Sequence, residues 1–69
     1  MIKQIDARGR SCPEPVILVQ RDYDRSDILS VLVDNSCAVE NITRFCEYKG
    51  GRVSVAQQGD EYTLTVTKP

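Results

Sequence analysis

The 69-residue chain contains no histidine and no tryptophan, and it has only one phenylalanine and one methionine. The absence of histidine excludes the Cys–His and Ser–His–Asp catalytic arrangements and removes the commonest zinc ligand. The three cysteines lie far apart, so they offer no closely spaced metal-binding set. We therefore expect no metal and no cofactor. Any chemistry here has to be thiol chemistry, activated by backbone dipoles and cations.

The sequence also lacks the features of secreted and membrane proteins. A secreted disulfide scaffold of this length usually carries an even and denser set of cysteines, so free thiols in a reducing compartment are expected. No apolar run approaches the roughly 20 residues of a membrane span, and the first residues do not resemble a signal peptide. These absences predict a cytoplasmic protein that does not bind a membrane.

There is no excess of charge of either sign. Nine basic and ten acidic residues give a net charge of −1, which argues against binding DNA and against direct binding of RNA. The arginines could still form a basic face for an acidic partner or tRNA, although such charges more often form a solvated surface. The residues concerned are Arg8, Arg10, Arg21, Arg25 and Arg52.

The first half of the chain predicts strand, helix and strand within a single domain, residues 1–69. Ile2–Asp6 is typical of a short strand. A helix is expected from about Pro13 to Asp24, with Cys12 at its cap and Val16, Val19 and Tyr23 facing inward. The nearly continuous apolar run 28–33 suits a central strand. This order predicts a crossover that makes the two strands parallel.

The second half predicts a helix followed by a hairpin. The segment 34–36 has N-cap chemistry, and 49–51 has the cation and glycines of a helix end. Between them lies a buried stripe: Ala38, Val39, Ile42, Phe45 and Cys46. Residues 52–57 and 62–67 alternate with period two around a turn at 58–61. Their apolar members should face the helices: Val53, Val55, Tyr62, Leu64 and Val66.

These elements predict one fold class, an α+β two-layer sandwich. The order is β-α-β-α-β-β, which gives a four-stranded mixed sheet with two helices on one face. The same order occurs in RNA-binding modules. Without a basic excess or exposed aromatic residues on the sheet, that analogy carries little weight.

Cys12 is the candidate reactive residue. A helix N-terminus carries unpaired N–H groups and about half a positive charge, and such positions lower the pKa of cysteine from about 8.5 toward 3.5–7.5. Arg8 and Arg10 on the preceding loop could add positive potential. The alternative is that Cys12 is only a capping or buried residue, because free cysteine is among the most buried residue types.

The segment 6–16 favours the reactive alternative, because its spacing is Asp, two residues, Gly, two residues, Cys-Pro-any-Pro. This pattern closely resembles the signature of the TusA/SirA/YedF family of small sulfur-transfer proteins. Segments 31–35 and 38–42 look most like the N-terminal, SirA-like domain of YedF-type proteins, which often continue into a DsrE-like domain. The resemblance covers essentially the whole chain. Arg10 departs from it, because family members usually have an apolar residue there.

The resemblance implies a sulfurtransferase-type sulfur carrier. In such proteins the motif cysteine, here Cys12, accepts sulfane sulfur as a persulfide from a protein donor, a cysteine desulfurase or rhodanese. It then passes the sulfur to an acceptor protein, so tRNA would be served only indirectly, in tRNA thiolation or in sulfur or selenium metabolism. Asp6, Gly9, Pro13 and Pro15 match the motif framework. The alternative is a regulatory or protein-interaction domain that retains the motif as structure.

The other two cysteines have less specific expectations. Cys46 falls within the apolar stripe of the second helix and is expected to pack in the core as a small hydrophobic residue. Cys37 falls outside that stripe, near the helix start. It could act as a resolving thiol opposite Cys12 or be an exposed spectator.

Overall fold

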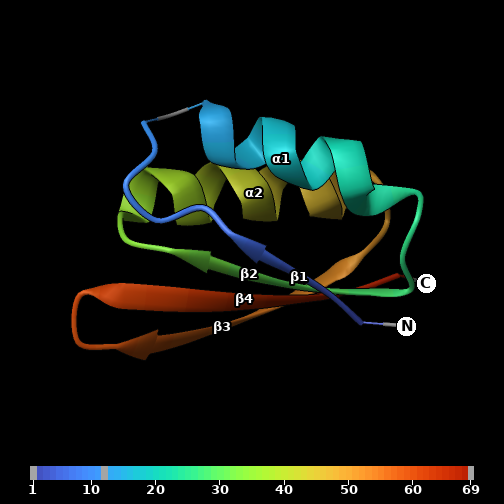
Figure 1. Cartoon of the computed structure of the whole chain (residues 1–69). Coiled ribbons are helices and arrows are strands. Elements are labelled where there is room, and N and C mark those ends of the chain that lie inside the picture. Colours follow the sequence, from blue (N-terminus) through green and yellow to red (C-terminus); the bar gives the residue numbers. More distant parts are fainter. Residues whose placement is uncertain (1, 12, 69) are drawn as a thin grey trace.

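The computed structural model describes residues 2–11 and 13–68 (Figure 1). Its elements are β1 (Ile2–Asp6), α1 (Glu14–Tyr23), β2 (Ile28–Val33), α2 (Ser36–Tyr48), β3 (Arg52–Gln58) and β4 (Glu61–Thr67). The sheet order is β1-β2-β4-β3; β1 and β2 are parallel, and β4 is antiparallel to both of its neighbours. Figure 1 shows both helices on one face of the sheet. The predicted two-layer mixed sandwich is confirmed.

The core lies between the helices and the sheet, and β2 is its central strand. Alternate residues of β2 point toward the helices because side chains alternate across a strand. Leu29, Val31 and Val33 are each at most 1% exposed. Burying an aliphatic side chain of this size contributes roughly 1.5–3 kcal/mol to stability. Neither helix in the described part of the chain is long and apolar enough to cross a membrane.

Helix α1 begins one residue later than predicted. Among the described residues, its first intrahelical hydrogen bond runs from Ile17 N–H to the Pro13 carbonyl, 3.2 Å away. Pro13 is therefore the N-cap rather than the first helical residue. Cys12, which was predicted at the cap, lies outside the described residues. Pro15 lies in the first turn, where proline costs no helical hydrogen bond.

The inward face of α1 is also slightly different from the prediction. Val19 and Tyr23 are buried as expected, whereas Val16 is only half-buried. Pro15 is fully buried, although the sequence pattern had not placed it in the core. The buried positions 15, 19 and 23 are spaced by four, so they form one row along the helix.

Helix α2 follows its prediction closely. The Asn35 side chain caps it by accepting a hydrogen bond of 2.7 Å from Ala38 N–H. Ala38, Ile42 and Cys46 are buried, while Val39 and Phe45 are half-buried against them. At the other end Gly50 has φ +87°, and Gly51 N–H donates to the Cys46 carbonyl at 2.9 Å. These are the features of a Schellman motif.

The hairpin of β3 and β4 contains the one clear misplacement in the predicted core. Leu64 and Val66 are buried, and Val53 and Tyr62 are half-buried against the core. Val55, although paired with Leu64, is 46% exposed. It belongs to an edge strand, and Figure 1 shows the hairpin end of β3 turned away from α2. The twist of the sheet therefore leaves this position uncovered.

Candidate functional site

The loop that leads to Cys12 starts where β1 ends. Ala7 N–H donates to the Leu32 carbonyl at 2.8 Å, which extends the β1–β2 pairing by one residue beyond β1. Ala7 is also fully buried. The first residue of the loop is therefore part of the sheet and the core. The segment that leads to Cys12 therefore starts from a residue fixed in the core.

Asp6 and Arg8 form the next fixed contact. The two carboxylate oxygens of Asp6 accept hydrogen bonds from Arg8 N–H (3.2 Å), Nε (3.0 Å) and Nη2 (2.8 Å). Hydrogen bonding to the Arg8 side chain and backbone lowers the pKa of the Asp6 carboxyl from 3.8 to about 2. The Asp6 and Glu61 carboxylates raise the pKa of the Arg8 guanidinium. Arg8 is thus held as a permanent cation between two carboxylates.

Glu61, the first residue of β4, ties this pair to the hairpin. Its Oε2 accepts from Arg8 Nη1 at 3.1 Å, across 53 positions of sequence. All three side chains are about half exposed, so water screens the attraction and each pair contributes little to stability. The effect of these ion pairs is on geometry, because the Arg8 guanidinium joins the end of β1 to the start of β4.

Gly9 has a backbone conformation that glycine favours, and its amide has a charged partner. Its φ is +75°, in the left-handed region that L side chains rarely adopt. Its N–H donates to Oδ2 of Asp34 at 2.8 Å. Asp34 follows directly after β2, and Asn35 beyond it caps α2. This bond joins the motif loop to the junction of β2 and α2.

The last part of the loop leads into α1. Glu14 N–H donates to the Ser11 carbonyl at 2.8 Å, and Arg10 Nη1 pairs with Glu14 Oε2 at 3.1 Å. The positive charge of Arg10 is therefore partly neutralised by Glu14. Neither arginine expected to support the cysteine has an unpaired guanidinium, since Arg8 faces Asp6 and Glu61.

Cys12, the predicted reactive residue, lies outside the described residues. Its chain neighbours Ser11 and Pro13 are both exposed, so the described chain on either side of it is at the surface. The four framework residues of the motif all lie at this end of the molecule: Asp6, Gly9, Pro13 and Pro15.

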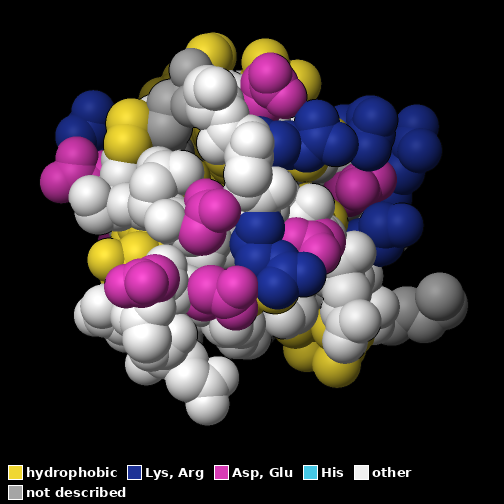
Figure 2. Space-filling view, turned by 60° about the vertical axis from the view of Figure 1, so that its left-hand side comes forward, with side chains coloured by type: hydrophobic (Ala, Val, Ile, Leu, Met, Phe, Trp, Pro, Cys, Tyr) yellow, Lys and Arg dark blue, Asp and Glu magenta, His cyan; other side chains and the backbone are white. Residues whose placement is uncertain are grey.

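Charges of both signs surround this end of the molecule. An open hollow of about 580 Å³ is lined by Asp6, Arg8, Gly9, Arg10, Asp34 and Glu61. Figure 2 shows acidic and basic side chains interleaved across the centre of this view, with lysines and arginines gathered along one edge. The mixture agrees with the near-zero net charge of the chain. It resembles a solvated surface more than the continuous basic stripe of a nucleic-acid binder.

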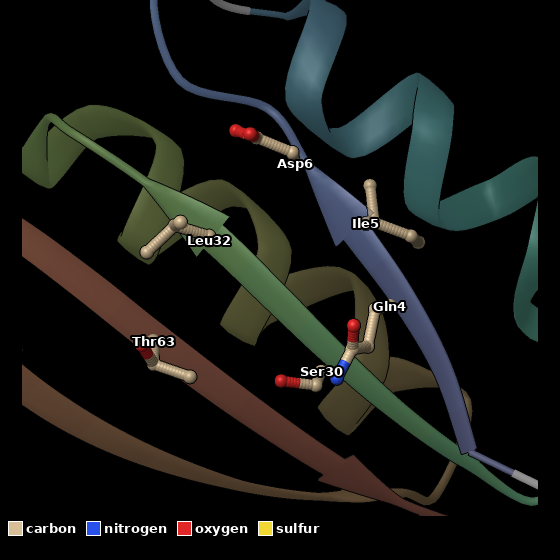
Figure 3. Close-up of a pocket in the computed structure, with 6 residues that line it drawn as sticks. All are labelled: Gln4, Ile5, Asp6, Ser30, Leu32 and Thr63. Carbon is tan, nitrogen blue, oxygen red and sulfur yellow. The ribbon is translucent and has the colours of Figure 1, made fainter.

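A second depression, of about 430 Å³, lies on the sheet and is lined by Gln4, Ile5, Asp6, Ser30, Leu32 and Thr63 (Figure 3). Ser30 and Leu32 alternate with the core residues of β2, so this depression is mainly on the face away from the helices. Its lining contains no nucleophilic thiol and no cation. It therefore offers neither of the groups that the predicted thiol chemistry uses.

The other two cysteines differ sharply in environment. Cys46 is fully buried, and this burial raises the pKa of its thiol from 9.0 to about 11, which makes it inert near neutral pH. Cys37 is exposed, and Asn41 Nδ2 lies 3.6 Å from its Sγ. Both are free thiols. Among the described residues no group of three or more histidine, cysteine, aspartate or glutamate side chains could hold a metal ion.

Asp34 and Glu61 are the residues of this site that the sequence interpretation missed. Asp34 was interpreted as part of the cap of the second helix and as part of segment 31–35 of the family resemblance, but not as a site residue. Its contact with the loop could have been anticipated, because the carboxyl ends of two adjacent parallel strands meet at one edge of a sheet. Glu61 gave no such signal, because its position depends on the length and register of the hairpin.

Comparisons with known proteins identify the family of the chain. The family model described as sulfurtransferase TusA matches residues 3–68. The chain is 36% identical over 63 residues to the sulfur carrier protein TusA of Pseudomonas syringae pv. tomato, covering 87% of this chain and 74% of the relative. It is 33% identical over 64 residues to the protein of the same name from Pseudomonas syringae pv. syringae, covering 88% and 75%.

The fold has a solved counterpart as well. The crystal structure of a SirA-like protein from Desulfitobacterium hafniense superposes with a TM-score of 0.85 at 28% identity, over 97% of this chain and 96% of that one. The match therefore extends through both helices and the whole sheet. With a family model and curated relatives that span nearly its full length, the chain belongs to the TusA family.

Proposed function

We propose that this protein is a sulfur carrier of the cytoplasm whose working atom is the sulfur of Cys12. The observation that supports this most directly is the set of contacts that hold the motif loop. The chain before Cys12 is held by hydrogen bonds to Leu32 in β2, to Asp34 just after β2 and, through the Arg8 side chain, to Glu61 in β4, while the chain after it enters α1. The proposed role of this loop is to present Cys12 to a partner protein.

The chemistry follows from a thiolate at a helix N-terminus. The helix dipole favours the anionic sulfur, and the absence of histidine throughout the chain means that no imidazole takes its proton. The Cys12 thiolate attacks the terminal sulfur of a persulfide on the donor. The S–S bond of the donor breaks, the donor thiolate leaves, and Cys12 carries the sulfur as its own persulfide.

Delivery is the same reaction in the other direction. A thiolate of the acceptor protein attacks the terminal sulfur of the Cys12 persulfide, and the Cys12 thiolate is the leaving group. Neutral sulfur moves at each step without external oxidant or reductant, so no cofactor is required. The donor would be a cysteine desulfurase or a rhodanese-type protein, and tRNA would receive the sulfur only through the acceptor.

A loading experiment tests the proposal. The protein is incubated with a cysteine desulfurase and cysteine, and intact mass is measured without reductant. We expect a mass gain of one sulfur atom, absent in Cys12→Ser and retained in Cys37→Ser and Cys46→Ser. An adduct that survives Cys12→Ser would place the sulfur on another thiol. A wild-type protein that gains no sulfur would instead favour a regulatory or interaction domain.

A further inference from the structure

Two backbone N–H groups of the motif loop donate hydrogen bonds to the end of β2 and to the residue that follows it. Ala7 N–H bonds to the Leu32 carbonyl, and two residues later Gly9 N–H bonds to the Asp34 carboxylate, both at 2.8 Å. The first of these bonds continues the sheet. The second lies beyond it, so Asp34 holds the loop after regular strand pairing has ended.

Two carboxylates accept hydrogen bonds from backbone N–H groups of this loop: Asp6 accepts from Arg8, two residues away, whereas Asp34 accepts from Gly9 across 25 positions of sequence. Arg8 and Arg10 also make ion pairs through flexible, half-exposed side chains, which act on the main chain only indirectly. The Gly9 bond acts on the main chain itself. It joins an N–H to an ionised acceptor, and such charge-assisted bonds are about twice as strong as neutral ones. It therefore restrains the backbone three residues before Cys12.

Asp34 is itself well placed to serve as an anchor. It stands between Val33, which is 0% exposed, and Asn35, whose side chain caps α2. The backbone on both sides is thus part of the core or of a helix start. The left-handed φ of Gly9 turns its N–H toward this anchor. A β-carbon on Gly9 would meet nothing within 4 Å, so glycine is needed there for backbone direction and not for space.

We propose that Asp34 is a positioning residue for Cys12: its carboxylate, by holding the Gly9 amide, sets the path of the loop that presents the cysteine to donor and acceptor proteins. This proposal rests on the proposed sulfur-carrier function and deepens it. Asp34 does not exchange sulfur; it acts through Gly9. A competing explanation is that the Asp34 charge only stabilises the N-terminus of α2, where acidic residues are generally favourable.

Two substitutions at position 34 separate these explanations. Asp34→Ala removes both the acceptor and the charge. Asp34→Asn removes the charge and keeps an oxygen that can accept from Gly9 N–H. We expect Asp34→Ala to lower the rate constant for loading by a desulfurase about tenfold, as small misplacements of reacting groups do. Asp34→Asn should stay within about threefold of wild type, because a neutral hydrogen bond remains.

Two control variants isolate general effects. Val66→Ala truncates a buried residue of β4, which pairs with Leu29 at the opposite end of the sheet. It should lower thermal stability and leave the loading rate unchanged. Glu47→Ala removes an exposed carboxylate near the C-terminal end of α2. It should change neither quantity. Hydrogen exchange of the Gly9 amide should accelerate in Asp34→Ala and in neither control.

Three results would overturn the proposal. Loading of Asp34→Ala at the wild-type rate is one, and equal slowing of Asp34→Ala and Val66→Ala is another. Loading of Asp34→Asn as slow as that of Asp34→Ala would assign the effect to charge alone. If the wild type takes up no sulfur, the proposed function fails separately. The role of Asp34 is then decided by Gly9 exchange and by the rate of Cys12 alkylation with iodoacetamide, and unchanged values in Asp34→Ala reject it.

Discussion

The phenol oxygen of Tyr23 lies 2.9 Å from the position that a β-carbon on Gly51 would occupy. Tyr23 is the last residue of α1, and Gly51 completes the turn after α2, so this approach joins the ends of the two helices. The Tyr23 ring packs edge-on against Phe45, with centroids 5.5 Å apart. Its hydroxyl is buried and has no hydrogen-bond partner in the described part of the chain.

This contact predicts coupling between the two positions. Gly51→Ala should lower the free energy of unfolding by about 1–3 kcal/mol, because the new methyl group overpacks the site. Tyr23→Phe should be close to neutral, since the hydroxyl it removes makes no bond. Adding Tyr23→Phe to Gly51→Ala should recover part of the loss. Urea unfolding of the four proteins measures this, and strictly additive effects would contradict it.

The left-handed backbone of Gly9 predicts a defect in sulfur loading that is larger than its effect on stability. Gly9→Ala should lower the free energy of unfolding by about 1 kcal/mol, the cost of a left-handed L-residue. It should also slow loading by a desulfurase, because the loop relaxes away from this φ. Thermal unfolding and the loading rate are measured on the same samples.

The hairpin supplies the matched control for that variant. Gly59 has φ +62°, and a β-carbon there also meets nothing within 4 Å. Gly59→Ala should therefore cost a similar amount of stability and leave loading unchanged. If both variants load equally slowly, backbone strain alone is responsible. The special role of the Gly9 turn would then be rejected.

Asp6 predicts an acid-sensitive loop. Its pKa is about 2 in the folded protein and near 3.8 in an ordinary environment, so the unfolded chain takes up this proton first. The contribution of Asp6 to stability is therefore complete above about pH 3.8 and is lost as the pH falls through about 2. The NMR signal of the Arg8 Nε–H reports the contact directly.

Asp6→Asn tests which group controls that signal. The substitution should remove the titration of the Arg8 Nε–H resonance between pH 4 and 2. Asp60→Asn, which removes an exposed carboxylate of the hairpin turn, should leave the titration in place. A persistent transition in Asp6→Asn would assign it to another acid, and Glu61 would be examined next.

Cys46 predicts a loss of stability in alkali. Burial raises its pKa from 9.0 to about 11, so above pH 9 the unfolded chain loses the proton while the native protein keeps it. The contribution is present below about pH 9 and is lost as the pH rises through about 11, amounting to about 3 kcal/mol for this fully buried thiol. Tyr23, whose pKa burial also raises, acts in the same direction.

A pair of cysteine variants isolates this effect. The free energy of unfolding of Cys46→Ala should fall less steeply between pH 8.5 and 11 than that of the wild type. Cys37→Ala, which removes an exposed thiol, should keep the wild-type slope. Equal slopes for Cys46→Ala and the wild type would show that the buried thiol does not control this range.

The fold could be predicted because its signals are local. The apolar run at 28–33, the Asn35 cap and the glycines at 50–51 each act over a few residues, and the structure uses all of them. Val55 was misplaced because its exposure depends on the twist of the whole sheet. The start of α1 was misplaced by one residue because proline is acceptable both at the cap and in the first turn.

In the candidate site, too, the local features could be predicted from the sequence and the long-range contacts could not. The motif residues were predicted because their spacing is contiguous in the sequence; in the structure Asp6 ends β1 and Gly9 lies in the loop that follows. The partners of that loop were not found. Asp34 lies 25 positions from Gly9, and Glu61 lies 53 positions from Arg8. Such contacts depend on strand order and register, which a local pattern does not specify.

The two prolines of the motif limit how many hydrogen bonds the N-terminus of α1 can donate to an anion. Neither has an N–H, the Glu14 amide is already donated to Ser11, and the Ile17 amide is donated to Pro13. Four of the five positions from 13 to 17 therefore have no uncommitted N–H to offer an anion. The N-terminus of α1 thus attracts negative charge mainly through the electric field of the helix dipole and little through directed hydrogen bonds. For the sulfur carrier proposed above, such weak holding would favour release of the sulfur to an acceptor protein.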